Sequence, residues 1–503
     1  MRAKALMITG TSSSAGKSTF VCALGRILSD MGVKVAPFKG QNMALNSMVT
    51  KSGHEIARAQ YSQSLACRVE AEVEMNPVLL KPTSEHSSQV IVMGKPRFES
   101  SGVSFQKRKK ELRVIVEGAL EQLLSRYEFV LLEGAGSPAE INLLDNDLVN
   151  LGLARRFNIP SVLVGDIERG GVFASIFGTV EILPKELSEL FVGFVINKFR
   201  GQVEVLEPGL RVLEERCDTR CFGVMPYIKV QIPEEDSLSA QELLKGSKGA
   251  SLSPLSICVV RLPFLSNLSD FDPLVLDDDV RLSFTESADD LDKCDLIILP
   301  GTKSTVLDLE WLRNVGLDKA ISLAISSGKV VLGICGGYQM LGTSISDGVE
   351  SDREYSVGLG HLNVRTVFFE EKILRQIRGF VSSGVLRGIA IDGYQIHNGV
   401  VENLNESALF DATYQEGGET VATSEGSVSK DQIFGSSIHG VFENDDFREK
   451  FLLHVAQLSQ KSYTPQGKKY REILDKTYDD VAEVAKETLL IDELLVMSER
   501  WFP

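Results

Sequence analysis

The sequence contains little cysteine and no long apolar run. Its 503 residues include seven scattered cysteines, and an odd number without regular spacing predicts no disulfide framework. The close pair Cys217 and Cys221 has no second pair or histidine cluster nearby, so it lacks the ligand set of a zinc site. No apolar stretch reaches the ~20 residues that span a bilayer, and no targeting segment is recognisable. These features favour a cytoplasmic protein that binds no membrane.

Positive charge is also scarce. The chain has 53 Lys and Arg against 69 Asp and Glu, which gives a formal net charge of −16. Nonspecific nucleic-acid binding needs a basic surface, so no nucleic-acid partner is expected. An anionic ligand must instead meet local lysines, arginines or backbone N–H groups. The content of 43% hydrophobic and 24% charged residues is typical of a globular protein, and the length allows two to four domains at roughly 100–200 residues each.

Apolar runs alternate with helical patterns in both halves of the chain. Continuous apolar runs predict strands of parallel sheets buried on both faces, with helices as the crossovers between them. In the first half, the expected strands are residues 4–9, 33–37, 129–132, 161–164, 191–196 and 222–225. In the second half, they are residues 257–262, 296–299, 330–334 and 389–391. The predicted fold class is therefore α/β, with two doubly wound, mostly parallel sheet domains.

A change of composition marks the boundary between the two predicted domains. The segment 233–254 is polar and contains Gly, Ser and Pro, which predicts a linker with room for one short helix. The predicted division is 1–232 for the first domain, 255–445 for the second and 446–503 for a C-terminal helical extension. Within that extension, residues 470–497 carry apolar side chains at helical spacing.

A loop of small residues follows the first expected strand. It reads GTSSSAGKS over residues 10–18, and a helix is expected from Lys17 onward. Small residues let successive N–H groups point at phosphates, and the N-terminus of the helix adds positive potential. Lys17 can then reach the β- and γ-phosphates of ATP, while the Ser18 hydroxyl can bind Mg²⁺. The predicted ATP-binding residues of this loop are Gly10, Ser14, Ala15, Gly16, Lys17 and Ser18.

Four residues outside the loop are candidates for the same site. Glu133 ends an expected strand, and an acid at that end of an open α/β sheet lies beside the phosphate loop, where it can hold Mg²⁺. Asp166 ends the next strand and is a second metal candidate. Asn197 follows a further strand, where related folds place adenine contacts. Lys39 follows the second strand and is placed to pair with a substrate carboxylate or phosphate; the alternative for these positions is a solvated loop residue.

A cysteine occupies a sharp turn between an expected strand and helix in the second half. Glycines two before and two after Cys335, in GICGG at 333–337, permit the elbow that exposes a nucleophile. The start of a helix also favours the thiolate. A distant histidine is the expected base for acyl transfer. His439 is favoured because a short strand precedes it and a glycine follows it, and His397 is the rival.

The predicted nucleophile also needs two N–H donors for an oxyanion. One is expected from Gly336, directly after Cys335. The other is expected from Gly301, in the loop PGTKS that ends the strand at 296–299, because small residues there let the backbone approach the substrate. A simple turn is the alternative for that loop.

Nine segments in the same order resemble the cobyric acid synthase family, and together they span about residues 3–445. They are GTSSSAGKS, PFKGQNMALNS, EMNPVLLKP, EGAGSPAEINL, GDIERGGVFAS, LPGTKSTVLDL, GICGGYQML, DGYQIHNG and IHGVFEN. Each motif is modest alone, but nine in order are specific. The long first loop, with five residues between its glycines, is similar to that of the dethiobiotin synthetase branch of P-loop proteins.

The resemblance implies a dethiobiotin-synthetase-like domain joined to a class I glutamine amidotransferase-like domain. It implies amidation of the b, d, e and g carboxylates of adenosylcobyrinic acid a,c-diamide, with ATP and Mg²⁺ as cofactors and glutamine and the corrinoid acid as small-molecule substrates. The family nucleophile matches Cys335, and the family base matches His439. The wider class places Glu two residues after this His, where the chain has Val441. A third catalytic residue therefore stays unassigned, and Glu443 cannot be given that role from the sequence.

Two alternatives remain beside this interpretation. A cobyrinic acid a,c-diamide synthase would share both sites, and only the resemblance of PFKGQNMALNS and EMNPVLLKP favours the cobyric acid branch. A partition-type P-loop ATPase is the alternative from a different class. That class places a second lysine early in the phosphate loop, whereas residues 10–15 contain none, and the cysteine elbow would have no purpose there.

Overall fold

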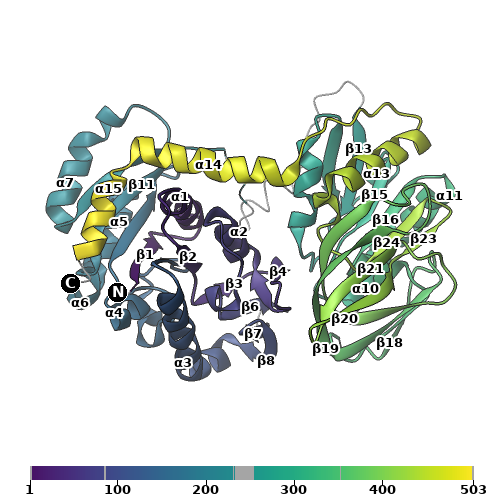
Figure 1. Cartoon of the computed structure of the whole chain (residues 1–503), viewed down its shortest axis with the longest axis horizontal. Coiled ribbons are helices and arrows are strands. Elements are labelled where there is room, and N and C mark those ends of the chain that lie inside the picture. Colours follow the sequence, from purple (N-terminus) through teal and green to yellow (C-terminus); the bar gives the residue numbers. More distant parts are fainter. Residues whose placement is uncertain (1–2, 84–86, 230–231, 233–253, 352, 501–503) are drawn as a thin grey trace. The chain divides into compact units, whose positions relative to one another are not determined.

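The computed structural model contains two compact units (Figure 1). It describes residues 3–83, 87–229, 232, 254–351 and 353–500. Unit 1 comprises residues 1–44, 56–238 and 474–503, and unit 2 comprises residues 45–55 and 239–473. Two segments differ from the predicted boundaries. Residues 45–55 belong to unit 2, although they lie in the first half of the sequence, and the last helices belong to unit 1, although they lie at the end of the sequence. The predicted linker lies outside the described residues except for its last position.

Unit 1 is built on a six-stranded parallel sheet with the order β12-β11-β10-β1-β9-β2. Its strands are β1 (Lys4–Gly10), β2 (Val35–Phe38), β9 (Phe129–Glu133), β10 (Ser161–Asp166), β11 (Phe191–Phe199) and β12 (Arg220–Pro226). Each corresponds to an expected strand, because each carries the apolar run of a doubly buried position. The order reverses beside β1, so its carboxyl end lies at the switch point where such sheets bind ligands.

Helices and a small second sheet complete unit 1. The helices are α1 (Lys17–Asp30), α2 (Arg58–Ala66), α3 (Gly102–Arg126), α4 (Leu151–Phe157), α5 (Val172–Ile182), α6 (Lys185–Ser188), α7 (Glu207–Cys217), α14 (Tyr470–Thr488) and α15 (Ile491–Arg500). The small sheet has the order β3-β6-β7-β8, with β3 (Gln41–Met43), β6 (Val78–Pro82), β7 (Ser87–Val92) and β8 (Lys95–Ser101). Helix α14 begins at the boundary of the two units, at the end of unit 2.

Unit 2 contains a second parallel sheet, with the order β14-β13-β15-β16-β24-β23 and only β23 antiparallel. Its strands are β13 (Leu255–Val260), β14 (Val280–Thr285), β15 (Leu296–Leu299), β16 (Val330–Ile334), β23 (Ser427–Ser429) and β24 (Ile433–Ser436). The associated helices are α9 (Ala288–Leu291), α10 (Thr305–Asn314), α11 (Leu317–Ser326), α12 (Gly336–Leu341) and α13 (Asp445–Leu458).

A mostly antiparallel sheet forms the other layer of unit 2. It consists of β17 (Ser344–Ser346), β18 (Tyr355–Val357), β19 (Val364–Val381), β20 (Ala390–Asn403), β21 (Phe410–Glu416) and β22 (Glu419–Glu425). A strand lies at the position expected for 389–391, since residues 390 and 391 begin β20, but the expected parallel pairing was wrong because β20 pairs antiparallel with β19. Buried side chains of the two sheets, such as Ile298 and Ile377, belong to one hydrophobic core.

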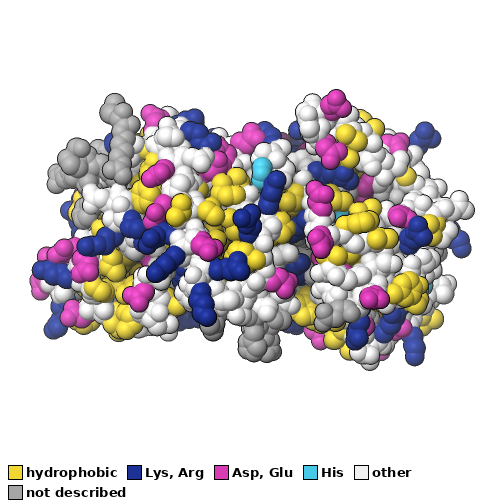
Figure 2. Space-filling view, turned by 90° about the horizontal axis from the view of Figure 1, so that it is seen from below, with side chains coloured by type: hydrophobic (Ala, Val, Ile, Leu, Met, Phe, Trp, Pro, Cys, Tyr) yellow, Lys and Arg dark blue, Asp and Glu magenta, His cyan; other side chains and the backbone are white. Residues whose placement is uncertain are grey.

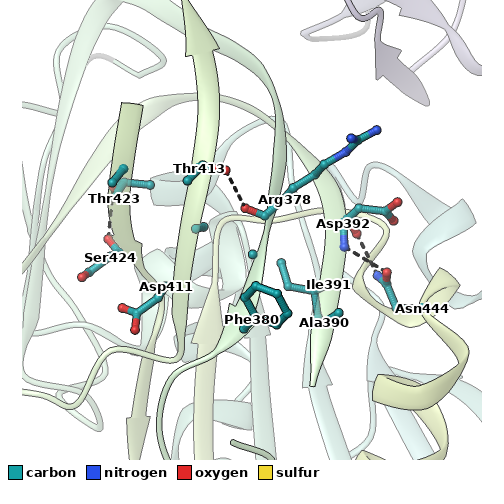
Figure 3. A pocket seen from close by; sticks show the side chains of 13 residues that line it. Arg378, Phe380, Ala390, Ile391, Asp392, Asp411, Thr413, Thr423, Ser424 and Asn444 are labelled. Atoms are coloured by element: carbon teal, nitrogen blue, oxygen red, sulfur yellow. Dashed lines mark hydrogen bonds between the residues drawn. The ribbon is translucent and has the colours of Figure 1, made fainter. Parts of the chain in front are cut away.

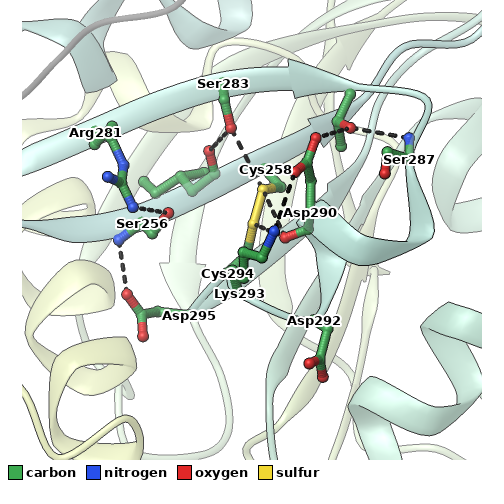
Figure 4. The surroundings of a disulfide bond; sticks show 12 residues. Ser256, Cys258, Arg281, Ser283, Ser287, Asp290, Asp292, Lys293, Cys294 and Asp295 are labelled. Carbon is green, nitrogen blue, oxygen red and sulfur yellow. Dashed lines mark hydrogen bonds and ion pairs between the residues drawn. A yellow bond between two sulfur atoms is a disulfide. The ribbon is translucent and has the colours of Figure 1, made fainter.

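A disulfide joins two cysteines that the sequence left unpaired (Figure 4). Cys258 lies in β13, and Cys294 lies two residues before the neighbouring strand β15. Their Cα atoms are 5.9 Å apart, and 36 residues separate them in sequence. The expectation of no disulfide was therefore wrong for this pair, because the sheet brings together positions that have no regular spacing.

On the face drawn in Figure 2, basic and acidic side chains are interspersed rather than gathered into a field of one sign. Within the described ranges, no helix is both long and apolar enough to cross a membrane.

Candidate active sites

The phosphate loop of unit 1 connects β1 to α1 at the switch point of the parallel sheet. Lys17 Nζ donates hydrogen bonds to the carbonyl oxygens of Ser12, at 3.0 Å, and Gly136, at 3.2 Å. Gly16 has φ 98°, and a Cβ there would lie 1.9 Å from Asn197 Nδ2. The positive φ favours glycine at this position, and Asn197 lies over it, donating to the Ala15 carbonyl at 2.9 Å.

Glu133 is the centre of a buried polar group beside the loop. Its Oε1 accepts hydrogen bonds from Ser18 Oγ and from Lys39 Nζ, each at 3.0 Å, and Gln63 donates to its other oxygen. Burial opposes the charge, but the lysines Lys39 and Lys17 outweigh it and hold the pKa of Glu133 below its usual range. The structure thus brings an ionised carboxylate into contact with the predicted Mg²⁺-binding hydroxyl.

Asp166 has different partners. It forms an ion pair with Lys198 at 3.0 Å, and Lys198 also donates to the Ser14 carbonyl at 2.6 Å. Within the described part of the chain, no hydrogen bond joins Asp166 to Ser18 or Glu133, and no group of three or more His, Cys, Asp or Glu could hold a metal ion. The Ser18–Glu133 pair therefore fits a Mg²⁺ that takes its other ligands from phosphate and water.

Cys335 occupies a strained turn between β16 and α12 of unit 2. Its backbone has φ 50° and ψ −109°, values that a non-glycine residue rarely adopts. A Cβ at Gly337 would lie 2.0 Å from the Leu299 oxygen, and one at Gly333 would lie 2.6 Å from the Tyr338 nitrogen. Both glycines are thus required for the turn, as the predicted elbow demands.

His439 is the histidine that meets this cysteine. It follows β24, and its backbone exchanges hydrogen bonds with Tyr394 of β20, at 2.8 and 3.2 Å. The Tyr394 ring stacks on the imidazole, with centroids 5.4 Å apart. The Cys335 side chain is close enough to the His439 ring to help raise the pKa of the imidazole. The structure therefore brings together the two side chains that the sequence predicted as nucleophile and base.

Asp270 is the partner of His439 that the sequence did not reveal. Its Oδ2 lies 2.7 Å from His439 Nδ1, and its Oδ1 accepts from the Gly440 N–H at 2.8 Å. Burial opposes the charged ring, but Asp270 and then Cys335 outweigh it and raise the pKa of His439 to about 10. Asp270 thus takes the orienting position of a Cys–His–acid triad.

The residues beside His439 do not take that position. Val441 is buried in the hydrophobic core, and Glu443 lies 4.0 Å from Arg471. No sequence signal identifies Asp270, because it lies 169 residues before His439 in a short 3-10 helix, Leu268–Leu276, without a recognisable motif.

The rival histidine has a different environment. His397 Nδ1 lies 2.7 Å from the Gly399 carbonyl, so this nitrogen carries the proton and donates. Burial is the main cause that lowers the pKa of His397 to about 3. The ring is therefore neutral at ordinary pH. It has neither a carboxylate partner nor a cysteine contact among the hydrogen bonds of the described residues.

The loop after β15 lies against both catalytic candidates. A Cβ at Gly301 would be 3.0 Å from His439 Cε1, and a Cβ at Gly336 would be 3.3 Å from the Thr302 nitrogen. Gly336 begins α12, so its N–H has no partner within the helix. The loop thus brings the Thr302 nitrogen close to Gly336, whereas the sequence argument named Gly301 of the same loop as the second donor.

Asp308 fixes this loop from α10. The Thr302 hydroxyl donates to Asp308 Oδ2, and both carboxylate oxygens lie 3.3 Å from the Phe264 N–H. Burial raises the pKa of Asp308 to about 7. The Asp308 side chain is fully buried and does not contact solvent. Its hydrogen bond with the Thr302 hydroxyl therefore helps to fix the position of the loop.

Residues 45–55, which we call the strap, contribute to unit 2 from the first half of the chain. Their strands β4 (Ser47–Val49) and β5 (Glu55–Ala57) form a small two-stranded sheet. The strap touches the turn that carries Asp270. Asn46 Oδ1 accepts from the Leu268 N–H at 3.0 Å, and the Ser47 N–H donates to Asn267 Oδ1 at 3.3 Å.

A hollow of about 700 Å³ opens on the antiparallel sheet of unit 2 (Figure 3). It is lined by residues of β19 to β22 and by Asn444, which exchanges hydrogen bonds with the Asp392 backbone at 2.9 and 2.7 Å. None of its lining residues is Cys335, His439 or Asp270. The hollow is therefore separate from the catalytic candidates.

The phosphate loop and the cysteine elbow together define a class of protein, a P-loop synthetase joined to a glutamine amidotransferase. A family model described as "CobQ/CobB/MinD/ParA nucleotide binding domain" matches residues 6–238. Another, described as "CobB/CobQ-like glutamine amidotransferase domain", matches residues 256–447. The glutamine amidotransferase match argues against the alternative of a partition-type ATPase, for which the cysteine elbow would have no purpose.

Full-length relatives identify the family. A cobyric acid synthase of Caldanaerobacter subterraneus subsp. tengcongensis is 41% identical, with 99% of each chain covered. One of Thermoanaerobacter sp. (strain X514) is 40% identical, also with 99% of each chain covered, and one of Clostridium kluyveri is 40% identical over 96% of each. The chain belongs to the cobyric acid synthase family. It is a glutamine amidotransferase-type ligase of cobalamin biosynthesis that uses ATP.

Proposed function

We propose that the chain amidates the b, d, e and g carboxylates of adenosylcobyrinic acid a,c-diamide, with ATP, Mg²⁺ and glutamine, to give adenosylcobyric acid. The observation that carries this proposal is the presence of a complete phosphate site and a Cys–His–Asp group in one chain of this family. A carboxylate is a poor electrophile, so it must be activated before an amine can displace its oxygen.

Unit 1 supplies the activation. Lys17 and the loop N–H groups neutralise the phosphates of ATP, and the Ser18–Glu133 pair fits Mg²⁺. The acceptor carboxylate attacks the γ-phosphorus and forms an acyl phosphate, with ADP as the leaving group. Lys39, which pairs with Glu133 at 3.0 Å, steadies the incoming carboxylate or the transferred phosphoryl group. Asn197, which donates to the Ala15 carbonyl of the loop, contacts the adenine, and Asp166 with Lys198 borders the loop at Ser14.

Unit 2 supplies the nitrogen. The Cys335 thiol passes its proton to His439 as its sulfur attacks the carboxamide carbon of glutamine, and the N–H groups of Gly336 and of the loop Gly301–Thr302 receive the negative oxygen. His439 gives a proton to the leaving ammonia and then activates water against the thioester, which releases glutamate. Asp270 holds the proton of His439 Nδ1 in place. The ammonia attacks the acyl phosphate, and inorganic phosphate leaves.

Mass spectrometry of the corrinoid product tests this function. The chain is incubated with the a,c-diamide, ATP, Mg²⁺ and glutamine, and the amides added per corrinoid are counted. Four added amides support the proposal. A chain that leaves the a,c-diamide unchanged but adds two amides to cobyrinic acid is instead the sister enzyme, cobyrinic acid a,c-diamide synthase.

A further inference from the structure

One family motif has roles in both units. PFKGQNMALNS occupies residues 37–47, and its Lys39 bonds Glu133 in the phosphate site of unit 1. Its middle, β3, pairs with β6, and the Ala44 N–H donates to the Leu80 carbonyl at 3.0 Å. Its last three residues, Leu45, Asn46 and Ser47, begin the strap in unit 2. The phosphate site explains the first part of the motif but not the second.

The strap is fastened to unit 2 along its whole length. Beyond Asn46 and Ser47, the Val49 carbonyl accepts from Gln376, and Glu55 pairs with Lys372 at 2.8 Å. The Glu55–Lys372 pair is buried, with 0% and 5% of the side chains exposed, and Ser47 Oγ also donates to Glu55 at 2.9 Å. Removing one member of such a pair leaves a buried charge without compensation, so the contact strongly holds the strap in place.

The turn beneath the strap controls the histidine. Asn267 adopts the left-handed conformation, with φ 55° and ψ 46°, which is uncommon for a non-glycine residue. Its side-chain amide lies 3.2 Å from His439 Nδ1, and its carbonyl accepts from the Asp270 N–H at 3.0 Å. The strap bonds to two neighbouring residues of this turn. The Ser47 N–H donates to the Asn267 side chain, and the Asn46 side chain accepts from the Leu268 N–H. A shift of the strap therefore moves the groups that orient His439.

We propose that the strap is a positioning element of the glutaminase site, through which occupancy of the Lys39–Glu133 phosphate site sets the rate of glutamine hydrolysis. The proposal rests on the proposed function. Binding of ATP and the acceptor brings negative charge to Lys39, and Lys39 changes its position in response. The strand β3, which follows Lys39 in sequence, transmits this displacement along the backbone to Asn46 and Ser47. Asn267 and Asp270 then orient His439 for turnover. Ammonia is in this way released mainly when an acceptor is ready to receive it.

Asn46→Ala in the full chain tests the proposal, because it removes the acceptor of the Leu268 N–H without touching either reacting centre. The glutaminase turnover number is measured with and without ATP, Mg²⁺ and the a,c-diamide, together with synthesis from ammonium. We expect the stimulated turnover to fall about tenfold toward the unstimulated value, while synthesis from ammonium stays within about twofold. Asn405→Ala, at an exposed asparagine of unit 2, is the matched control and should change neither rate.

Three outcomes overturn the proposal. In the first, ATP and the acceptor stimulate the glutaminase of Asn46→Ala as strongly as that of the unaltered chain. In the second, Asn46→Ala loses glutaminase activity and synthesis from ammonium to the same extent. In the third, ATP and the acceptor do not change the glutaminase rate of the unaltered chain. Failure of the proposed function looks different, because the unaltered chain would then add no amides.

Amide hydrogen exchange measured on the unaltered chain provides a second test, which does not depend on whether Asn46→Ala folds. A non-hydrolysable ATP analogue with Mg²⁺ and the a,c-diamide should raise amide protection at residues 45–55 and 264–271 together. Protection confined to the phosphate loop overturns the proposal.

Discussion

The phosphate site of unit 1 and the cysteine site of unit 2 are assembled in opposite ways. The phosphate loop is nearly contiguous, since residues 10–18 supply most of its groups and Glu133 and Lys39 complete it. The cysteine site is collected from four distant segments, which contribute Asp270, Thr302, Cys335 and His439. A local site depends mainly on its own backbone, whereas a dispersed site depends on the packing of the whole unit. Substitutions near the two sites should therefore differ in which activity they remove.

Lys17→Ala should have the largest effect. It removes the cation that the Ser12 and Gly136 carbonyls hold in the phosphate loop, and loss of one such electrostatic contact costs on the order of 10²–10³-fold. We expect amidation to fall by about 10³-fold with glutamine and with ammonium alike, measured as amides formed per minute. Loss with glutamine alone would place the ATP chemistry outside unit 1.

His439→Ala sharpens the comparison from the other side. We expect glutamine hydrolysis to fall by at least ~10²-fold, the usual scale for a lost acid–base group, because His439 is the imidazole whose pKa the neighbouring Cys335 helps to raise. Synthesis from ammonium should persist. His397→Ala is the matched control and should cost much less, since its ring is neutral and bonded to Gly399. Equal losses in the two variants would contradict the assignment of the base.

Asp270→Asn tests the residue that the sequence did not reveal. An amide cannot replace the charge that raises the pKa of His439, so this pKa should fall, as burial alone would make it do. We expect a loss of ~10–10²-fold in glutaminase kcat/KM, and the ionisation that depends on His439 should move to lower pH. An unchanged pH profile would show that Asp270 is only a structural neighbour.

Glu425→Gln should give the smallest effect, on stability rather than activity. Burial raises the pKa of Glu425 to about 7, although Ser436 and Ser437 donate to its carboxylate. The folded state therefore binds more protons than the unfolded state between pH about 4.5 and 7, so stability falls as pH rises through this window.

The neutral amide of Glu425→Gln should remove that pH dependence. A difference of ~1 kcal/mol corresponds to about 2–4 °C in the unfolding midpoint of a unit of this size. Parallel midpoint-versus-pH curves for the two proteins would contradict the raised pKa.

The sequence predicted most strands of the parallel sheets because these strands are buried on both faces, but it missed β14, which is partly exposed. β15 and β16 have the bounds that their apolar runs predicted, and β1 differs by one residue. The long strand β19 was missed because it mixes buried, half-exposed and exposed residues and contains polar stretches, and only the start of β20 fell within an expected strand, because polar residues such as Gln395 and His397 occupy its buried part. Their pairing depends on tertiary contacts between distant segments.

The cysteine site was predictable only where the backbone itself restricts the sequence. The turn requires Gly333 and Gly337, so these two glycines identify Cys335 as the residue at the elbow. Asp270 needs no particular neighbour, and its role appears only when the turn at Asn267 meets the loop of His439. The same holds for the strap, whose partners lie more than 200 residues away in the sequence.

A competition between two nitrogen sources tests the central claim most directly, namely that Cys335 supplies nitrogen while a separate site activates the acceptor. The a,c-diamide is incubated with ATP, Mg²⁺, glutamine labelled with nitrogen-15 in its amide, and an excess of unlabelled ammonium. With the unaltered chain, we predict a labelled fraction in the new amides above that given by free ammonium. Cys335→Ala should form unlabelled amides only, at a rate close to that of the unaltered chain with ammonium alone. Labelled amides from Cys335→Ala, or no amides at all from it, would contradict the account.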